Sequence, residues 1–236
     1  MSIGEALRYP TTGKDWKQTI VIGAFLKVFS FLIVPQLLIQ GYAVRVMRRT
    51  LDGDETCPPG ITEGDIGELM ADGAKLLGLA IVYHAIPVVV FFSLAGGSLA
   101  ALLGGEIVAG FLGLLTSAFV SLVLFAIFHY AFGAAAVNFV ANDSLLAAFS
   151  ADVLQVMISP AYISAKLTYF VIGFGVLLVK SVLAVIPLVH FVVPVLMPLV
   201  VKYANVAVPH LWTKAYLEAV DPAPRETQAE AAVETA

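Results

Sequence analysis

The sequence predicts an all-α, polytopic membrane protein: a transmembrane helical bundle with about five apolar segments and two amphipathic helices on the membrane surface. Composition is the first observation behind this prediction. Of the 236 residues, 60% are hydrophobic and 13% are charged, whereas soluble domains carry about 25% charged residues. The second observation is that the apolar residues form runs of about 20, the length that a helix needs to cross a bilayer.

Two segments have the pattern of helices that lie on the membrane surface. In residues 2–9, Ser2 and Glu5 have the spacing of a capping box ahead of a short apolar face. In residues 143–158, the preceding Asn142 can cap a helix whose leucine, valine and phenylalanine side chains gather on one side. Helices with one apolar side bind in the membrane interface.

Five apolar segments are long enough to cross a bilayer. They are residues 20–40, 76–95, 107–128, 167–186 and 191–212. With the surface helices they form a single membrane domain, residues 1–218. Residues 219–236 are rich in Pro, Glu, Ala and Thr and low in aromatic residues, so we expect a disordered acidic tail.

The first segment, residues 20–40, allows two interpretations because it contains Lys27 and Pro35. It is either one tilted span or a shallow hairpin that turns near Pro35. Basic residues flank it on both sides, while the turns at 96–106 and 187–190 contain no Lys or Arg. Because positive charges accumulate on the cytoplasmic side, this pattern favours the hairpin and places both chain termini in the cytoplasm.

A basic helix face follows the first segment. Arg45, Arg48 and Arg49 are spaced so that they share one side of a helix, and Tyr42 precedes them. An amphipathic ring beside basic side chains is typical of contact with anionic lipid headgroups. The simpler interpretation, which we favour, is that this face only anchors the topology.

Ionisable side chains inside apolar segments are candidates for function, because burying a charge in a bilayer is costly. Lys27, Lys180, His84 and His129 form this candidate intramembrane polar site. Two lysines without an intramembrane carboxylate are typical of a cavity that is lined by basic side chains and binds an anion. The alternative is that both lysines reach an interface by extending their long side chains.

Small residues recur every fourth position along the third segment, which is the pattern of a close helix–helix contact. The helix-packing stripe consists of Ala109, Gly113, Ser117 and Ser121.

Several classes of protein are disfavoured. The net charge of −4 makes nucleic acid an unexpected partner. The single cysteine, Cys57, excludes an internal disulfide and a cysteine-cluster metal site. No nucleophile elbow, phosphate-binding loop or pair of histidines at metal-ligand spacing is present. We therefore expect no enzymatic activity, no cofactor and no metal.

With these motifs in view, the chain resembles a family of archaeal multi-pass membrane proteins, common in haloarchaea, known as domain of unknown function 4013. The resemblance is carried by Glu5-Ala6-Leu7-Arg8-Tyr9-Pro10, the Gly41-Tyr42-x-x-Arg45 run and Asp72-Gly73-x-Lys75. It implies location in the cell membrane and brings no activity with it. The acidic loops agree with a haloarchaeal source.

The expected function is a structural, lipid-interacting or scaffolding role without enzymatic chemistry. Membrane lipids are the expected partners, with a homo-oligomer or a membrane-protein partner left open. The alternative is a transporter or channel for a small solute or an anion, because proline-broken segments and intramembrane lysines occur at transporter binding sites.

Overall fold

The computed structural model describes residues 3–57, 60–185 and 193–220, and these residues form helices and connecting turns without a strand. The all-α prediction is therefore confirmed. The helices are α1 (Ile3–Arg8), α2 (Trp16–Val28), α3 (Ile33–Leu51), α4 (Ile66–Leu103), α5 (Ile107–Asn142), α6 (Ala151–Ile158), α7 (Pro160–Val185) and α8 (Val193–Val220). Three 3-10 helices join them: η1 (Tyr9–Thr11), η2 (Glu63–Asp65) and η3 (Leu145–Phe149).

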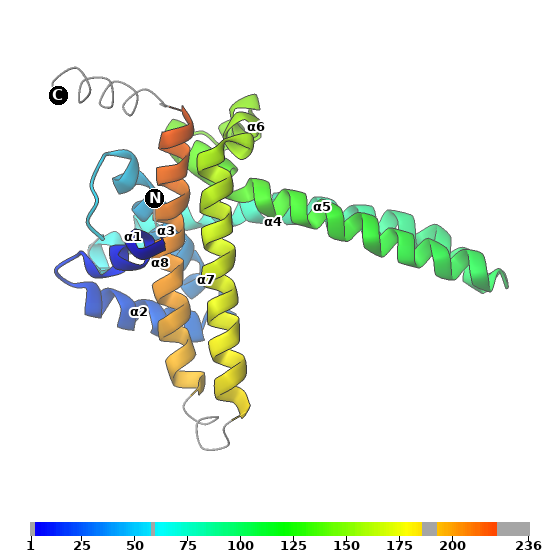
Figure 1. Cartoon of the computed structure of the whole chain (residues 1–236), viewed down its shortest axis with the longest axis horizontal. Coiled ribbons are helices and arrows are strands. Elements are labelled where there is room, and N and C mark those ends of the chain that lie inside the picture. The colour runs from blue at the N-terminus through cyan, green and yellow to red at the C-terminus, as the bar shows by residue number, and fades with distance from the viewer. Residues whose placement is uncertain (1–2, 58–59, 186–192, 221–236) are drawn as a thin grey trace, which may run out of the picture.

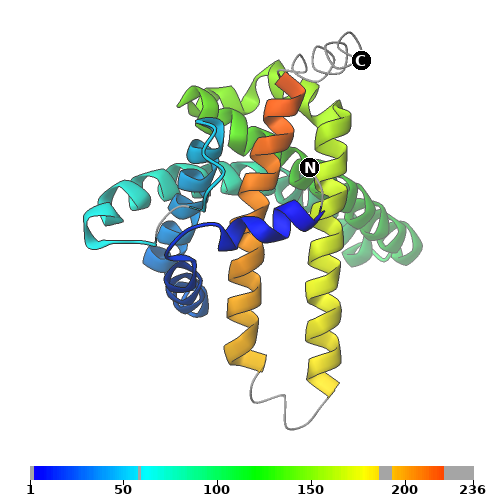
Figure 2. The same ribbon diagram turned by 60° about the vertical axis from the view of Figure 1, so that its left-hand side comes forward.

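Two long helical hairpins dominate the shape. Helices α4 and α5 pack along each other and extend away from the rest of the molecule, whereas α7 and α8 run side by side in a different direction (Figures 1 and 2). The α4–α5 turn is short and uses Gly105, whose φ of 87° is a conformation that glycine adopts without strain.

Within the described residues, three helices are long and apolar enough to cross a membrane: Glu63–Leu103, Ile107–Asn142 and Pro160–Val182. The first two contain the predicted segments 76–95 and 107–128, and the third contains most of 167–186. The prediction of about five apolar segments is not confirmed. Helix α8 covers the described part of segment 191–212 but is not among the three candidates.

Segment 20–40 is not one helix. Helix α2 ends at Val28 and α3 begins at Ile33, as in the hairpin interpretation, although the break precedes Pro35 by several residues. Pro35 lies in the first turn of α3, where its missing N–H has no intrahelical partner to lose. The turn exposes a cluster of apolar side chains, which we call the α2–α3 tip: Phe25, Val28, Phe31, Leu32, Ile33 and Val34.

Both segments predicted as surface helices contain helices. Helix α1 covers Ile3–Arg8 of the predicted segment 2–9, and the following Tyr9 is buried against α8. Residues 143–158 form η3 and α6, separated by an extended Ser150. The side chain of Asn138 explains the break, because its amide donates to the Ala147 carbonyl (2.8 Å) and to Ser150 Oγ (3.0 Å). Most of the predicted tail, residues 221–236, lies outside the described residues.

The core lies where α3, α4, α5 and α8 meet. Ala134, Ala135, Ala136 and Val137 of α5 have no exposed surface. Helices α3 and α4 cross at two glycines. A Cβ atom at Gly41 would overlap the Leu69 carbonyl, and one at Gly73 would overlap the Leu37 carbonyl. The two backbones are therefore in direct contact.

Substituting Gly41→Ala or Gly73→Ala should lower the free energy of unfolding by about 2–3 kcal/mol, because neither backbone carbonyl can move aside cheaply. Gly78→Ala, also in α4, is the matched control. Its Cβ meets open space, so it should be neutral or stabilising by up to about 1 kcal/mol. Unfolding midpoints in detergent test this, and equal effects at positions 41, 73 and 78 would contradict the close crossing.

Candidate functional site

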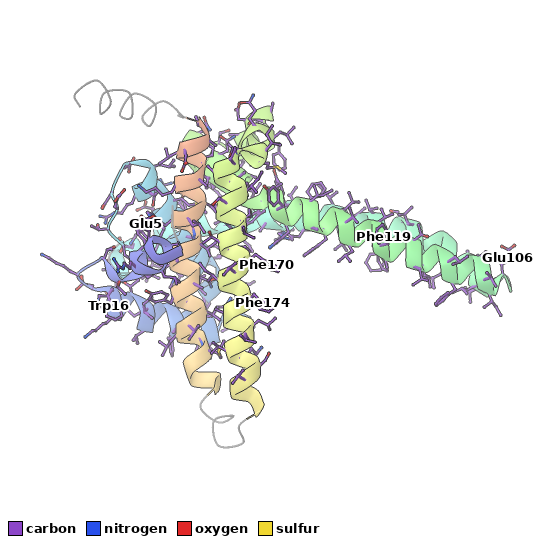
Figure 3. All side chains as sticks on the ribbon, viewed as in Figure 1. Glu5, Trp16, Glu106, Phe119, Phe170 and Phe174 are labelled. Carbon is purple, nitrogen blue, oxygen red and sulfur yellow. The ribbon has the colours of Figure 1, made fainter. Side chains whose placement is uncertain are left out.

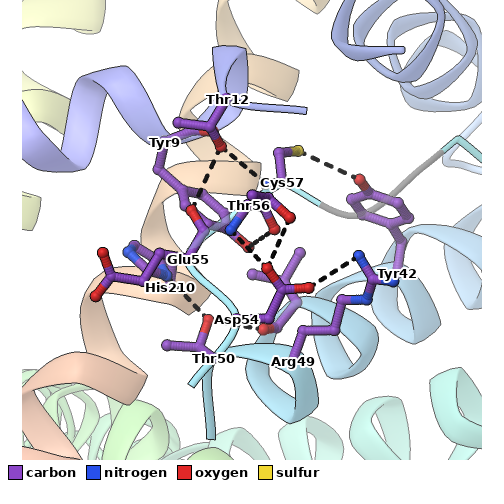
Figure 4. Close-up of polar contacts among 11 residues, drawn as sticks. Tyr9, Thr12, Tyr42, Arg49, Thr50, Asp54, Glu55, Thr56, Cys57 and His210 are labelled. Carbon is purple, nitrogen blue, oxygen red and sulfur yellow. Dashed lines mark hydrogen bonds and ion pairs between the residues drawn. The ribbon is translucent and has the colours of Figure 1, made fainter. Parts of the chain in front are cut away.

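Polar side chains gather where the C-terminal half of α3 meets the loop at residues 52–57, η1 and α8. Figure 4 shows this polar junction, with Arg49, Thr50 and Tyr42 from α3 on one side and His210 from α8 on the other. The loop contributes Asp54 and its neighbours. Segments far apart in the sequence are thus joined by hydrogen bonds and ion pairs.

The three arginines of the basic face are each paired with a carboxylate of the protein. Arg45 binds Asp65 through two contacts of 3.1 and 3.2 Å, and Arg48 binds Asp72 at 2.8 Å. Arg49 binds Asp54 at 3.2 Å. The face thus joins α3 to the start of α4 and to the loop. Lipid contact by these arginines stays a prediction, and their charge is largely compensated within the protein.

Tyr42 does not lie at the surface, as a headgroup contact would require. It is 2% exposed, and its hydroxyl lies 3.6 Å from Cys57 Sγ. The ammonium of Lys202 lies 4.4 Å from the centroid of its ring, which is a cation–π contact. The hydropathy pattern alone placed Tyr42 at a membrane boundary, whereas packing between α3 and α8 buries it.

His210 is held in a polar stack at the same junction. Its ring lies 3.7 Å from that of Tyr9 and nearly parallel to it, and Nδ1 is 2.9 Å from Thr50 Oγ1. Thr50 donates its own hydroxyl proton to the Val46 carbonyl, so Nδ1 of His210 is the donor in this hydrogen bond. Burial, aided by the positive charge of Lys214, lowers the pKa of His210 to about 4.

The structure brings two of the predicted intramembrane residues together. His84 Nε2 on α4 lies 3.4 Å from His129 Nδ1 on α5. His84 Nδ1 donates to the Ala80 carbonyl at 2.7 Å, so its Nε2 is the acceptor in the neutral pair. Phe125 contacts both rings, and Phe132 contacts the ring of His84. Among the described residues, no group of three metal-ligating side chains includes them.

Lys27 and Lys180 are not brought together. Lys27 is half-buried near the end of α2, and Lys180 is exposed on α7. The buried lysines are instead Lys166 and Lys202, and neither is among the candidates predicted from the sequence. Lys202 lies inside an apolar run, so the criterion that selected Lys180 would have found it. Lys166 precedes its apolar segment and carries no such signal.

Lys166 lies in a cage of aromatic rings between the two hairpins. Its ammonium is 4.5 Å from the Trp212 ring, with Tyr130, Tyr162 and Tyr169 at 5.3–5.8 Å. Among the described residues it has no hydrogen-bond partner, and neither does Trp212 Nε1. The Tyr162 hydroxyl accepts from the Ala134 N–H and donates to the Tyr130 carbonyl, so it enters the hydrogen-bond ladder of α5.

The structure places the four residues of the predicted packing stripe differently. Ser117 is buried against α4, Ser121 Oγ is buried, and a Cβ at Gly113 would overlap Ser98 Oγ. Ala109 is exposed, and Gly110 faces α4 in its place.

The comparison with known families agrees with the resemblance noted in the sequence. A family described as "Protein of unknown function (DUF4013)" matches residues 25–189. The chain belongs to this family. The match extends from the end of α2 to the end of α7, so it contains the α3–α4 crossing and the histidine pair. No curated protein and no solved structure matches the chain.

Removing one member of the α3–α4 ion pairs should destabilise the fold. Arg48→Met leaves the buried Asp72 without its partner, so we expect a loss of about 1–3 kcal/mol in unfolding free energy. Arg49→Met is the control. Its pair with Asp54 is exposed on both sides, and such pairs contribute less than about 1 kcal/mol. The double variant Arg48→Met, Asp72→Asn removes the unpaired charge as well. If it does not recover part of the lost unfolding free energy, the unpaired charge of Asp72 is not the cause of the loss.

His210 predicts a pH dependence of stability. Its pKa is about 4 in the folded protein and 6.5 when unfolded, so the unfolded state binds more protons between these values. The contribution is fully present above pH 6.5 and is lost as pH falls toward 4, by on the order of 2–3 kcal/mol. His210→Phe keeps a ring against Tyr9 and should flatten the unfolding midpoint measured across this window. An unchanged slope would contradict burial of a neutral His210.

Proposed function

We propose that this protein is a non-enzymatic integral membrane protein with a structural, lipid-interacting role. The observation that carries the proposal is the exposure of large apolar side chains along the two hairpins. Phe119 of α5 and Phe170 and Phe174 of α7 project from the helices in Figure 3, each with more than half of its surface exposed. Apolar surface of this extent on helices of membrane-spanning length is suited to lipid.

Two further segments support contact with lipid at a shallower depth. Phe31, at the α2–α3 tip, is 78% exposed, and its apolar neighbours in the tip are exposed as well. In η3 and α6, Leu146 and Ile158 are exposed to a similar degree. Short helices that present such side chains bind in the interface without crossing the bilayer.

The proposed topology is a multi-pass protein of the cell membrane with both termini in the cytoplasm. The α2–α3 hairpin supports it, because a segment that returns to its starting side leaves the basic residues on both flanks in one compartment. An archaeal source rests on the family resemblance and the acidic loops. A homo-oligomer or a membrane-protein partner remains open as part of a scaffolding role.

A role without chemistry is supported by the way the polar junction uses its side chains. The arginines bind carboxylates, and His210 binds Thr50. The alternative of a solute or anion transporter was based on Lys27 and Lys180, which lie on different helices without a described contact. Loss of solute flux in Lys180→Met would favour that alternative.

A nitroxide attached at position 31 in a Cys57→Ala, Phe31→Cys variant tests the proposal. In vesicles, oxygen, which partitions into lipid, should collide with this label more often than a water-soluble nickel complex does. Asp52→Cys, at the opposite end of α3 and exposed, is the control and should show the reverse preference. Equal nickel accessibility at positions 31 and 52 would overturn insertion of the tip.

A further inference from the structure

The side of α2 that faces α8 carries Thr19, Gly23 and Lys27, which recur at every fourth residue and so lie along one helix face. Lys202 of α8 crosses this face at Gly23. A Cβ atom at position 23 would overlap the Cδ and Cε atoms of Lys202. Glycine therefore makes room for the lysine side chain, which is 2% exposed.

The ammonium of Lys202 has no counter-charge in the described part of the chain. The ion pairs there engage three arginines and Lys214. Lys202 contacts the ring of Tyr42, and a cation–π contact offsets only part of the cost of burying a cation. Burial, and to a smaller extent the positive charge of Lys27, lower the pKa of Lys202 to about 8.

Thr19 lies on the same face of α2 and is buried. Its hydroxyl neighbours the hydroxyl of Tyr42, the residue whose ring Lys202 contacts. The charge of Lys27 acts on Lys202 across the crossing. Two ammonium groups thus approach the same crossing, and both can donate to one anion.

We propose that Lys27 and Lys202 bind an anionic phosphate group at the α2–α8 crossing. Phosphate oxygens accept charge-assisted hydrogen bonds from ammonium groups, and they would supply the counter-charge that Lys202 lacks. The phosphate belongs to a lipid headgroup or is free inorganic phosphate. The inference rests on the proposed lipid-interacting role and names the chemistry that is recognised.

The side from which a phosphate group can reach this site follows from the burial of the side chains around it. Lys202 and Thr19 are enclosed, whereas Lys27 is half-buried and lies beside Val28 of the exposed α2–α3 tip. A phosphate therefore enters from the Lys27 end. The acyl chains of a phospholipid would then lie against the apolar side chains of the tip.

The test uses the full chain, purified in a neutral detergent, with its unfolding midpoint measured against increasing inorganic phosphate. The same measurement is made in vesicles of phosphatidylcholine with and without phosphatidylglycerol. Wild type should be stabilised by at least one of the two. Lys202→Met and Lys27→Gln should weaken the apparent affinity about tenfold or more, which is the loss of one charge-assisted hydrogen bond.

Two further variants distinguish binding at this site from an effect of the protein's other positive charges on phosphate. Gly23→Ala keeps every charge but displaces the Lys202 side chain, so it should also weaken binding. Lys180→Met removes the same charge from an exposed position on α7 and should respond as wild type does.

Stabilisation by inorganic phosphate identifies a free anion, and stabilisation by phosphatidylglycerol alone identifies a lipid headgroup. The proposal is overturned if neither inorganic phosphate nor phosphatidylglycerol stabilises the wild-type protein. It is also overturned if Lys202→Met and Lys27→Gln are both stabilised as strongly as wild type. Lys27→Gln serves if Lys202→Met fails to fold, because position 27 is half-buried. The nitroxide measurement at position 31 needs no phosphate, so tip insertion can hold where this site fails.

Discussion

The direct backbone contact between α3 and α4 at Gly41 and Gly73 is the constraint on which the rest of the structure depends. Asp72 immediately precedes Gly73, so the point of closest approach also carries the carboxylate that binds Arg48. One turn after Gly41, Arg45 reaches Asp65 at the start of α4. Close approach shortens the distance that these side chains must span. The glycines therefore determine which charges can pair.

This crossing also decides what the rest of α3 can contact. With its arginines directed toward α4 and the loop, α3 presents Tyr42 to Lys202 and Thr50 to His210, both on α8. The basic motif and the aromatic residue before it are therefore parts of a helix-to-helix junction. A charged pattern beside an apolar run has the same appearance in sequence whether its charges face lipid or the protein's own carboxylates.

The predictable features were those that depend on neighbouring residues. Hydropathy indicated the all-α class and the apolar parts of α4, α5 and α7. The features that depend on distant residues could not be predicted. The break at Ser150 requires Asn138, and the cage around Lys166 requires Trp212 from another helix. Lys202 was visible in the sequence, but its burial depends on Gly23, far away in α2.

The two hairpins meet at a joint that is polar where membrane helices are usually apolar. Tyr162 of α7 places its hydroxyl between the Ala134 N–H and the Tyr130 carbonyl of α5. A Cβ atom at Gly133 would overlap Tyr162, Lys166 and Trp212, so this glycine leaves the space that these side chains fill. The two hairpins extend in different directions (Figure 1). The side chains of this joint lie where α5 meets α7 and α8, which is where the direction of one hairpin changes to that of the other.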